Sequence, residues 1–117
     1  MEKFYVPTRS VCAAVVLWFA KNQKKIDFRG GSTMNVMVDK IIELKHKHGL
    51  DTTHVSIRDD IGGRWKSDDL VGFPGVGTGS PTEEALNDCR EIIREDHKEC
   101  PDGIEKLVMA TGLEFLD

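Results

Sequence analysis

The residues best suited to bind a charged ligand form a short glycine-rich segment, Arg29-Gly30-Gly31-Ser32-Thr33, directly before a predicted helix. The first turn of a helix presents unpaired N–H groups and the positive end of the helix dipole, so it attracts phosphate or carboxylate groups. Glycines let the backbone approach an anion closely, and Arg29 can add two parallel hydrogen bonds. Lys24 and Lys25 precede the segment in the chain. The pattern predicts an anion site; the structural alternative is a tight turn that Ser32 caps.

A second glycine-rich segment, Gly75-Val76-Gly77-Thr78-Gly79-Ser80, precedes another predicted helix. Glu83 and Glu84 in the first turn of that helix complement its dipole, which disfavours phosphate there and favours a plain connecting loop. If both segments lie at one end of a sheet, Trp65 and Phe73 could supply a stacking face and Arg58 a second cation. Core packing is the alternative for each aromatic residue. The predicted ligand-binding residues are therefore Lys25, Arg29, Gly30, Gly31, Ser32, Thr33, Arg58, Trp65, Phe73, Gly75, Gly77, Thr78 and Gly79.

The sequence contains no recognisable catalytic or metal-binding motif. It has no Ser/His/Asp order, no nucleophile elbow and no HExxH. His46 and His48 are two residues apart, so they point away from each other on a helix. The pairs Asp59-Asp60 and Asp68-Asp69 match no EF-hand spacing and are typical of turns. We therefore predict no catalytic residue, no metal and no cofactor, with a phosphate-ester hydrolase as the enzymatic alternative.

Cysteine content and apolar runs indicate the compartment. The three cysteines, Cys12, Cys89 and Cys100, form no CxxC motif, which is typical of reduced thiols in the cytoplasm. Cys89 falls on an apolar helical stripe, which predicts an inert thiol. The longest apolar run covers residues 11–20, whereas a membrane-spanning helix needs about 20 residues. The run has the length of a signal-peptide core, but no small-residue cleavage site follows it. We therefore expect a buried helix and no membrane contact.

Charge is distributed unevenly along the chain, whose formal net charge is −4. Residues 1–50 hold nine Lys/Arg and four Asp/Glu, whereas residues 82–117 hold four and eleven. The isoelectric point of about 5.5 argues against binding of long nucleic acids, which usually requires a basic face. The acidic third could face the basic half, within one chain or across a dimer, or form a solvated helix.

Hydrophobic spacing predicts two helices in the first half. Residues 11–22 are apolar nearly all round, which indicates a central core helix or a dimer element, with Thr8 or Ser10 as the N-cap. Over residues 34–48, helical spacing is shown by Met34, Met37/Val38, Ile41, Leu44/Lys45 and His48, and Gly49 is a typical C′ residue.

The second half predicts strands and then helices. Alternation indicates strands at residues 54–58, 64–66 and 70–73, with a hairpin turn at Gly62-Gly63 and a further short strand at 26–28. Ser80 as N-cap and Glu83 at N3 predict a capping box that opens a helix. Gly112 should end a last short helix over 104–108. The buried stripe of the capped helix should be Ala85, Cys89, Ile92 and Ile93.

These elements together predict one domain over residues 1–117 of the α/β (α+β) class. We expect a two- or three-layer sandwich, with a small, mainly antiparallel sheet of three to five strands and three or four helices.

The order of elements over residues 33–94 resembles that of small phage and prophage accessory proteins with an α/β/α sandwich domain. A helix opening such as Ser80-Pro81-Thr82-Glu83-Glu84-Ala85-Leu86 is common in that group. The second half is also similar to HicB-like antitoxins, through Phe73-Pro74-Gly75 and the same helix opening. This chain differs from them because it begins with two helices and shows no appended DNA-binding domain. The phage resemblance implies a compact accessory protein that binds a host protein or sequesters a nucleotide signal.

Two functions follow as hypotheses. The first is a non-enzymatic binding protein of phage or prophage type, which holds a small phosphate-bearing ligand at the glycine-rich helix starts and sequesters a host defence signal. The alternative is a protein–protein inhibitor or antitoxin-like module, suggested by the apolar first helix, the apolar residues 113–116 and the acidic third. Both hypotheses predict a homodimer that forms through the first helix or the apolar C-terminal residues.

Overall fold

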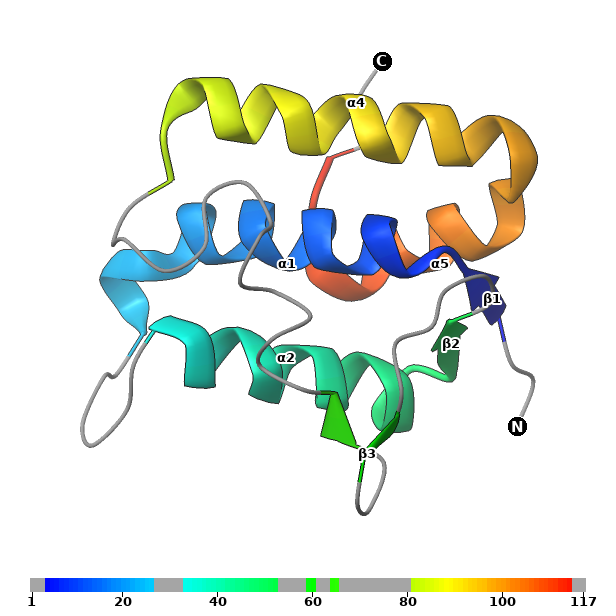
Figure 1. Cartoon of the computed structure of the whole chain (residues 1–117), viewed down its shortest axis with the longest axis horizontal. Helices are drawn as coiled ribbons and strands as arrows, with labels where there is room; N and C mark the ends of the chain where they lie inside the picture. The colour runs from blue at the N-terminus through cyan, green and yellow to red at the C-terminus, as the bar shows by residue number, and fades with distance from the viewer. Residues whose placement is uncertain (1–3, 27–32, 53–58, 61–63, 66–80, 115–117) are drawn as a thin grey trace.

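The computed structural model describes residues 4–26, 33–52, 59–60, 64–65 and 81–114, and their side chains over 4–26, 35–50 and 81–114. These residues form nine elements, and Figure 1 shows how the helices are arranged. In order they are β1 (Phe4–Val6), α1 (Thr8–Asn22), the 3-10 helix η1 (Gln23–Lys25), α2 (Thr33–Lys47), β2 (Leu50–Thr52), β3 (Asp59–Asp60), β4 (Arg64–Trp65), α4 (Glu83–Glu99) and α5 (Pro101–Thr111).

Among the described residues, four α-helices build the fold, so the predicted α/β sandwich is wrong. Strands form two short pairs, β1 with β2 in parallel and β3 with β4 antiparallel. Within the described residues, no sheet forms a layer that covers the helices. The physical reason is that α1 is apolar on nearly every side. It therefore accepts the apolar stripes of several helices, and a helix-on-helix core replaces the expected sheet.

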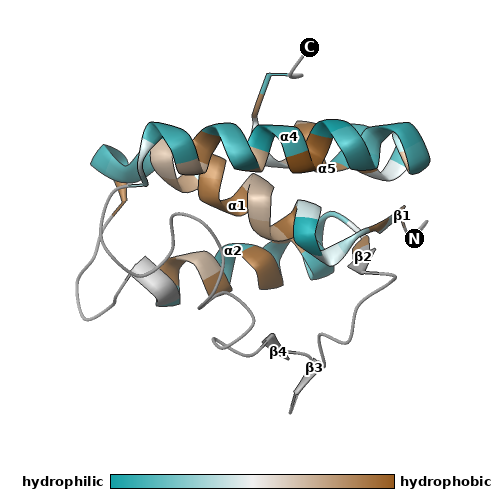
Figure 2. Ribbon diagram, turned by 45° about the horizontal axis from the view of Figure 1, so that its top comes forward, coloured by the Kyte–Doolittle hydropathy of each residue, from teal (hydrophilic) through white to brown (hydrophobic). Residues whose placement is uncertain are grey.

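Helix α1 is the centre of the core. Ten of its residues are buried, among them every residue from Val11 to Leu17. Figure 1 shows α1 between α4 on one side and α2 on the other, and Figure 2 shows that α1 is much more hydrophobic than α4. Phe19 is 2 % exposed, whereas Trp18 is partly buried with the Nζ of Lys40 4.9 Å from the centre of its ring. The core alternative for α1 is therefore confirmed, and its apolar face is unavailable as a dimer surface.

Helices α2 and α4 both run antiparallel to α1 (Figure 1). The first turn of α1 contacts the last turns of α4, where Arg9 meets Asp96. The strand before α1 pairs in parallel with the strand after α2, which requires α2 to run back along α1. We call the end with the first turn of α1 the closed end, and the end with its last turn the open end. Both α2 and α4 therefore begin at the open end.

The predicted apolar stripes of these two helices are largely confirmed. In α2, Met37, Val38, Ile41 and Leu44 are buried. In α4, Ala85, Cys89 and Ile93 are buried and Ile92 is partly buried against the core. Each stripe faces α1, because spacings of three and four residues return to the same side of a helix.

The predicted helix caps are wrong at two starts and right at two ends. Helix α1 begins at Thr8 after Pro7, and no side chain caps it. Helix α4 takes Thr82 as its N-cap, whose hydroxyl accepts a hydrogen bond from the backbone N–H of Ala85 at 3.1 Å. The position that a capping-box glutamate would take is therefore Ala85. Gly49 and Gly112 both have a φ of 69°, as expected of residues that end helices.

The last turn of α5 shows how its chain end is held. The N–H of Gly112 donates to the carbonyl of Met109, and the N–H of Leu113 donates to the carbonyl of Val108. This is a Schellman motif, which places Leu113 back against the apolar residues of the last turn. Leu113 packs on the core as a partly buried residue. It is therefore engaged within the chain.

The strand predictions have mixed outcomes. The hairpin expected around Gly62-Gly63 is confirmed by the antiparallel pairing of Asp59 with Trp65 and of Asp60 with Arg64. The predicted strands at 54–58 and 70–73, and most of that at 26–28, lie outside the described residues. The parallel pair β1–β2 was missed, because three-residue strands are too short for alternation to reveal them.

Candidate functional site

The structure describes the backbone that positions the first glycine-rich segment. Helix α2 begins at Thr33, directly after Ser32, so a helix N-terminus stands where the sequence predicts one. Lys25 is exposed in η1. The side chains of Thr33 and Trp65 are not described, and the remaining predicted ligand residues lie outside the described residues: Arg29, Gly30, Gly31, Ser32, Arg58, Phe73, Gly75, Gly77, Thr78 and Gly79. The binding role of this set therefore stays a prediction.

Lysines gather at the open end beside the start of α2. Lys21 lies in the last turn of α1, and Lys24 and Lys25 follow in η1, all three exposed. The start of α4 at the same end carries Glu83 and Glu84 in its first turn. These two carboxylates already complement the α4 dipole. The start of α2, which has no acidic residue in its first turn, is the more favourable place for an anion.

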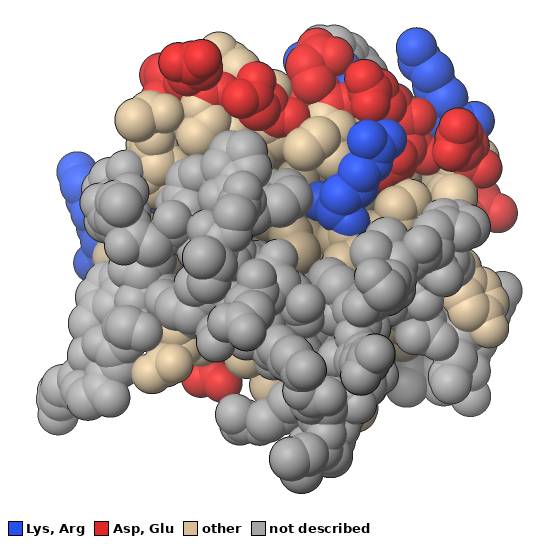
Figure 3. Space-filling view, in the orientation of Figure 1, with Lys and Arg blue, Asp and Glu red and all other residues tan. Residues whose placement is uncertain are grey.

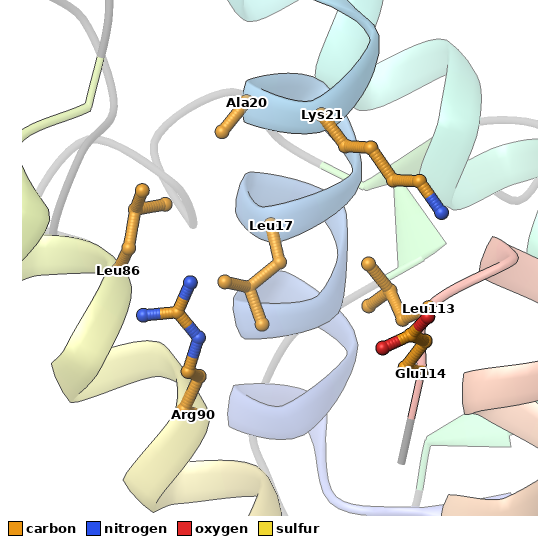
Figure 4. A pocket seen from close by; sticks show the side chains of 7 residues that line it. All are labelled: Leu17, Ala20, Lys21, Leu86, Arg90, Leu113 and Glu114. Atoms are coloured by element: carbon orange, nitrogen blue, oxygen red, sulfur yellow. The ribbon is translucent and has the colours of Figure 1, made fainter. Parts of the chain in front are cut away.

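A hollow of about 380 Å³ opens between α1, α4 and the residues after α5. Its lining consists of Leu17, Ala20, Lys21, Leu86, Arg90, Leu113 and Glu114. Figure 4 shows Leu86 and Arg90 on the α4 side of Leu17, and Leu113 with Glu114 on the other side. The lining is thus an apolar floor with charged groups around it. Sequence reasoning missed the hollow, since it joins three segments far apart in the chain.

The charged groups around the hollow differ in how they are held. The Nζ of Lys21 donates to the carbonyl oxygen of Gly112 at 2.8 Å, which ties the end of α5 to α1. The Nη1 of Arg90 donates to the Oδ1 of Asn87 at 2.7 Å. Within the part of the chain that the structure describes, no carboxylate forms an ion pair with Arg90. Its guanidinium therefore keeps donors for another acceptor.

The closed end contains a polar cluster that the sequence analysis did not foresee. The carboxylate of Asp96, 2 % exposed, accepts hydrogen bonds from the Nη2 of Arg9 at 2.6 Å and from the Nε at 3.0 Å. The hydroxyl of Ser10 donates to Oδ2 of the same carboxylate at 2.5 Å, the oxygen that also accepts from the Nε of Arg9. Glu95, on the surface, lies 3.3 Å from Arg9. These contacts join the first turn of α1 to the last turns of α4.

Arg9, Ser10 and Asp96 form a structural clamp that holds α1 against α4. A buried carboxylate is tolerated when it is paired and hydrogen-bonded, and both oxygens of Asp96 have donors. The hydrogen bonds from Arg9 to Asp96 raise the pKa of Arg9 above its ordinary value. One signal was present in the sequence: Asp96 follows Ile93 by three residues and so falls on the buried stripe of α4. Its partners, 86 and 87 residues away, left no local signal.

The outer face of α4 is strongly acidic. Figure 3 shows carboxylates gathered along this helix. The exposed members are Glu83, Glu84, Asp88, Glu91, Glu95 and Glu99. Arg94 lies 3.0 Å from Glu91 and so offsets part of the charge. The acidic C-terminal third thus presents much of its charge on the surface of α4, as expected of a solvated face.

The three cysteines carry thiols, and two of them are buried. Burial raises the pKa of Cys89 to about 12, so its thiol stays protonated near neutral pH, in agreement with the prediction of an inert group. The three cysteines, all described, form no disulfide. No group of three or more His, Cys, Asp or Glu among the described residues could hold a metal ion. None of the helices in the described ranges is both long enough and apolar enough to span a membrane.

Comparison with known proteins gives no match. No protein-family model matches the sequence, no curated protein matches it, and no solved structure matches the fold. The sandwich fold that the phage resemblance implied does not agree with the helical structure.

Proposed function

We propose that the protein is a non-enzymatic binding protein that holds a small phosphate-bearing ligand, such as a nucleotide, at its open end. The ligand would lie at the glycine-rich segment 29–33, before α2, with the segment 75–80 before α4 as a second wall. A phage or prophage protein of this kind would act in the host cytoplasm by sequestering a nucleotide signal.

The observation that carries the proposal is the antiparallel packing of α1 against both neighbours. Because α2 and α4 run opposite to α1, their N-termini come to the same end of the bundle (Figure 1). Helix N-termini attract anions through unpaired N–H groups and the dipole. Thr33 and Glu83 mark the two starts, and each follows a glycine-rich segment of the sequence.

The charges at this end support an anionic ligand. Lys21, Lys24 and Lys25 are exposed there, in a chain whose net charge is −4. Clustered cations raise the local concentration of small anions and speed their association. Glu83 and Glu84 weaken the start of α4 as an anion site, so the start of α2 would hold the phosphate.

Thermal unfolding tests the proposal when it is measured with a panel of nucleotides, cyclic nucleotides and ADP-ribose compounds. A ligand at 100 times its dissociation constant stabilises the folded protein by about 2.7 kcal/mol. For a domain of this size, that corresponds to a rise in Tm of roughly 10 °C. A panel without any rise would contradict the proposal.

Matched variants locate the site. We expect Arg29→Glu to abolish the rise in Tm that a bound nucleotide causes. The double variant Lys24→Gln/Lys25→Gln should weaken nucleotide affinity about fivefold, because an exposed charge pair usually contributes up to about 1 kcal/mol. The control Lys45→Gln/Lys47→Gln removes the same charge from the last turn of α2, at the closed end, and should leave affinity unchanged. Equal losses from both double variants would place the effect in overall charge and not at the open end.

The acidic face of α4 favours a second candidate function, a protein–protein inhibitor with a basic partner. The apolar first helix is engaged within the chain, since α1 forms the core. Of the apolar residues 113–116, Leu113 packs on that core, and residues 115–116 lie outside the described residues. The exposed carboxylates remain. A pull-down from host lysate should then recover a specific protein with the wild type and lose it with Glu84→Gln/Asp88→Asn. Recovery of nothing specific would count against this function.

A further inference from the structure

We propose that the hollow between α1, α4 and the residues after α5 binds a small carboxylate with an apolar body, and that Arg90 holds the carboxylate. None of the residues that line this site belongs to the glycine-rich segments, and its ligand class differs from the phosphate ligand proposed above. The two proposals can therefore fail independently.

The size and floor of the hollow set the apolar part of the ligand. Its volume of about 380 Å³ lies near the lower end of the usual range for small-molecule pockets, roughly 300–1,000 Å³. Leu17, Ala20, Leu86 and Leu113 supply the floor and walls. Leu17 is 6 % exposed, so the floor is the surface of the packed core and should keep its shape. A ring or a branched chain of about six carbons would cover it.

Arg90 supplies the charge that complements the ligand. Figure 4 shows its guanidinium next to Leu86, on the α4 side of Leu17. Asn87 accepts one of its hydrogen bonds at 2.7 Å, which orients the group and leaves other donors. A planar guanidinium binds a carboxylate through two parallel hydrogen bonds. The other α4 arginine near it, Arg94, lies 3.0 Å from Glu91 and outside the hollow.

The other charged groups of the hollow favour a ligand with a single negative charge. Lys21 uses one of its three donors on the carbonyl of Gly112, whereas Arg90 has five donors and gives one to Asn87, so Arg90 keeps more of them. The exposed carboxylate of Glu114 also borders the hollow, on the side opposite Arg90 (Figure 4). A second negative charge on the ligand would be repelled by Glu114. A carboxylate, with one charge, therefore fits better than a phosphate monoester.

Titration of the full chain with matched probes, followed by protein NMR, tests the ligand class. Phenylacetate is the main probe, phenylacetamide lacks its charge, acetate lacks its apolar body, and phenyl phosphate adds charge. We expect saturable binding of phenylacetate and affinities at least about tenfold weaker for the other three, because each lacks one favourable interaction or adds repulsion. Equal binding of acid and amide, or no binding of phenylacetate, would overturn the proposal.

Variants test the residues. Arg90→Gln should weaken phenylacetate binding about tenfold, whereas Arg94→Gln, one turn further along α4, should leave it unchanged. Ala20→Leu should abolish phenylacetate binding by filling the hollow. It provides a second test of the site if Arg90→Gln does not fold. Glu114→Gln should narrow the preference for phenylacetate over phenyl phosphate. Unchanged affinity in both Arg90→Gln and Ala20→Leu would refute the site. A second chain could occupy the hollow instead. In that case the protein would be a dimer that Ala20→Leu dissociates and that phenylacetate leaves intact, and this result would also refute the proposed site.

Discussion

Two arginines lie along the contact between α1 and α4, one at the closed end and one nearer the open end, and they are held differently. At the closed end, Arg9 from α1 is engaged by the buried carboxylate of Asp96. Closer to the open end, Arg90 near the middle of α4 borders a hollow and donates to the neutral Asn87. The residue type is the same, so the difference lies in the partner. An arginine paired with a buried carboxylate holds two helices together. An arginine hydrogen-bonded to a neutral side chain keeps donors that can bind a ligand.

The energetic reason is the cost of a buried charge. A carboxylate removed from water is tolerated only when donors replace the lost hydration, so Asp96 requires Arg9 and Ser10. Arg90 remains partly exposed, so water can solvate the guanidinium N–H groups that do not donate to Asn87. The closed end should therefore respond to mutation with large losses of stability, and the open end with small ones. Four substitutions test this difference, in order of expected effect on the free energy of unfolding.

Asp96→Ala should have the largest effect. It leaves the buried hydroxyl of Ser10 and the guanidinium of Arg9 without their acceptor. Breaking a buried pair usually costs 3–5 kcal/mol, and because half of the Arg9 side chain is exposed we expect about 3 kcal/mol. Urea unfolding monitored by circular dichroism measures it. The control is Glu95→Ala, which removes the neighbouring, exposed carboxylate and should cost less than about 0.5 kcal/mol. Similar losses for both variants would contradict a clamp centred on Asp96.

Gly103→Ala should come next, because it crowds the closed end. A Cβ at Gly103 would overlap the carbonyl oxygen of Tyr5 and lie 2.7 Å from Cγ1 of Val6. Overpacking costs typically 1–3 kcal/mol, and the better helix propensity of alanine returns up to about 1 kcal/mol. We expect a net loss of about 2 kcal/mol in the same unfolding experiment. A stabilised variant would mean that β1 can move away from α5 without cost.

Gly112→Ala should cost less, although glycine is again replaced by alanine. A Cβ at this position, near the open end, has no atom within 4 Å, so no clash arises. The cost comes from the φ of 69°, which is unfavourable for residues other than glycine by about 1 kcal/mol. Thermal unfolding of Gly103→Ala and Gly112→Ala side by side separates crowding from backbone strain. A larger loss for Gly112→Ala would show that the open end is the more tightly constrained of the two.

Arg90→Ala should have the smallest effect on stability, below about 0.5 kcal/mol, because a partly exposed side chain hydrogen-bonded to a neutral neighbour contributes little. Differential scanning calorimetry can resolve this against Asp96→Ala. A loss above about 2 kcal/mol would indicate a structural role like that of Arg9. In that case the contrast between the two ends would disappear.

Local pattern was a good guide to the helices and a poor guide to how they assemble. The stripes of α2 and α4 could be read from spacing, since three- and four-residue steps return to one helix face. The same stripes fit a sheet or another helix equally well, which is why a sandwich was expected. The N-cap of α4 was placed two residues early, because Ser80, Thr82 and Glu83 satisfy the sequence rules in more than one register.

For the candidate site, the sequence located a helix start after Ser32 and the lysines before it. It did not indicate the hollow or the clamp. Leu17, Arg90 and Leu113 belong to three segments, and Arg9 is separated from Asp96 by 87 residues. No local periodicity relates such distant positions, so their contacts could not be predicted from spacing.

The sequence by itself determined where helices form, which of their faces are apolar, and where Gly49 and Gly112 end them. These properties depend on interactions within a few residues along the chain. Only the tertiary structure decided that α1 packs against helices on both sides, that Asp96 is buried with Arg9, and that Arg90 borders a hollow. The physical reason is that burial and pairing depend on which distant segments exclude water together, and that is a property of the assembled core.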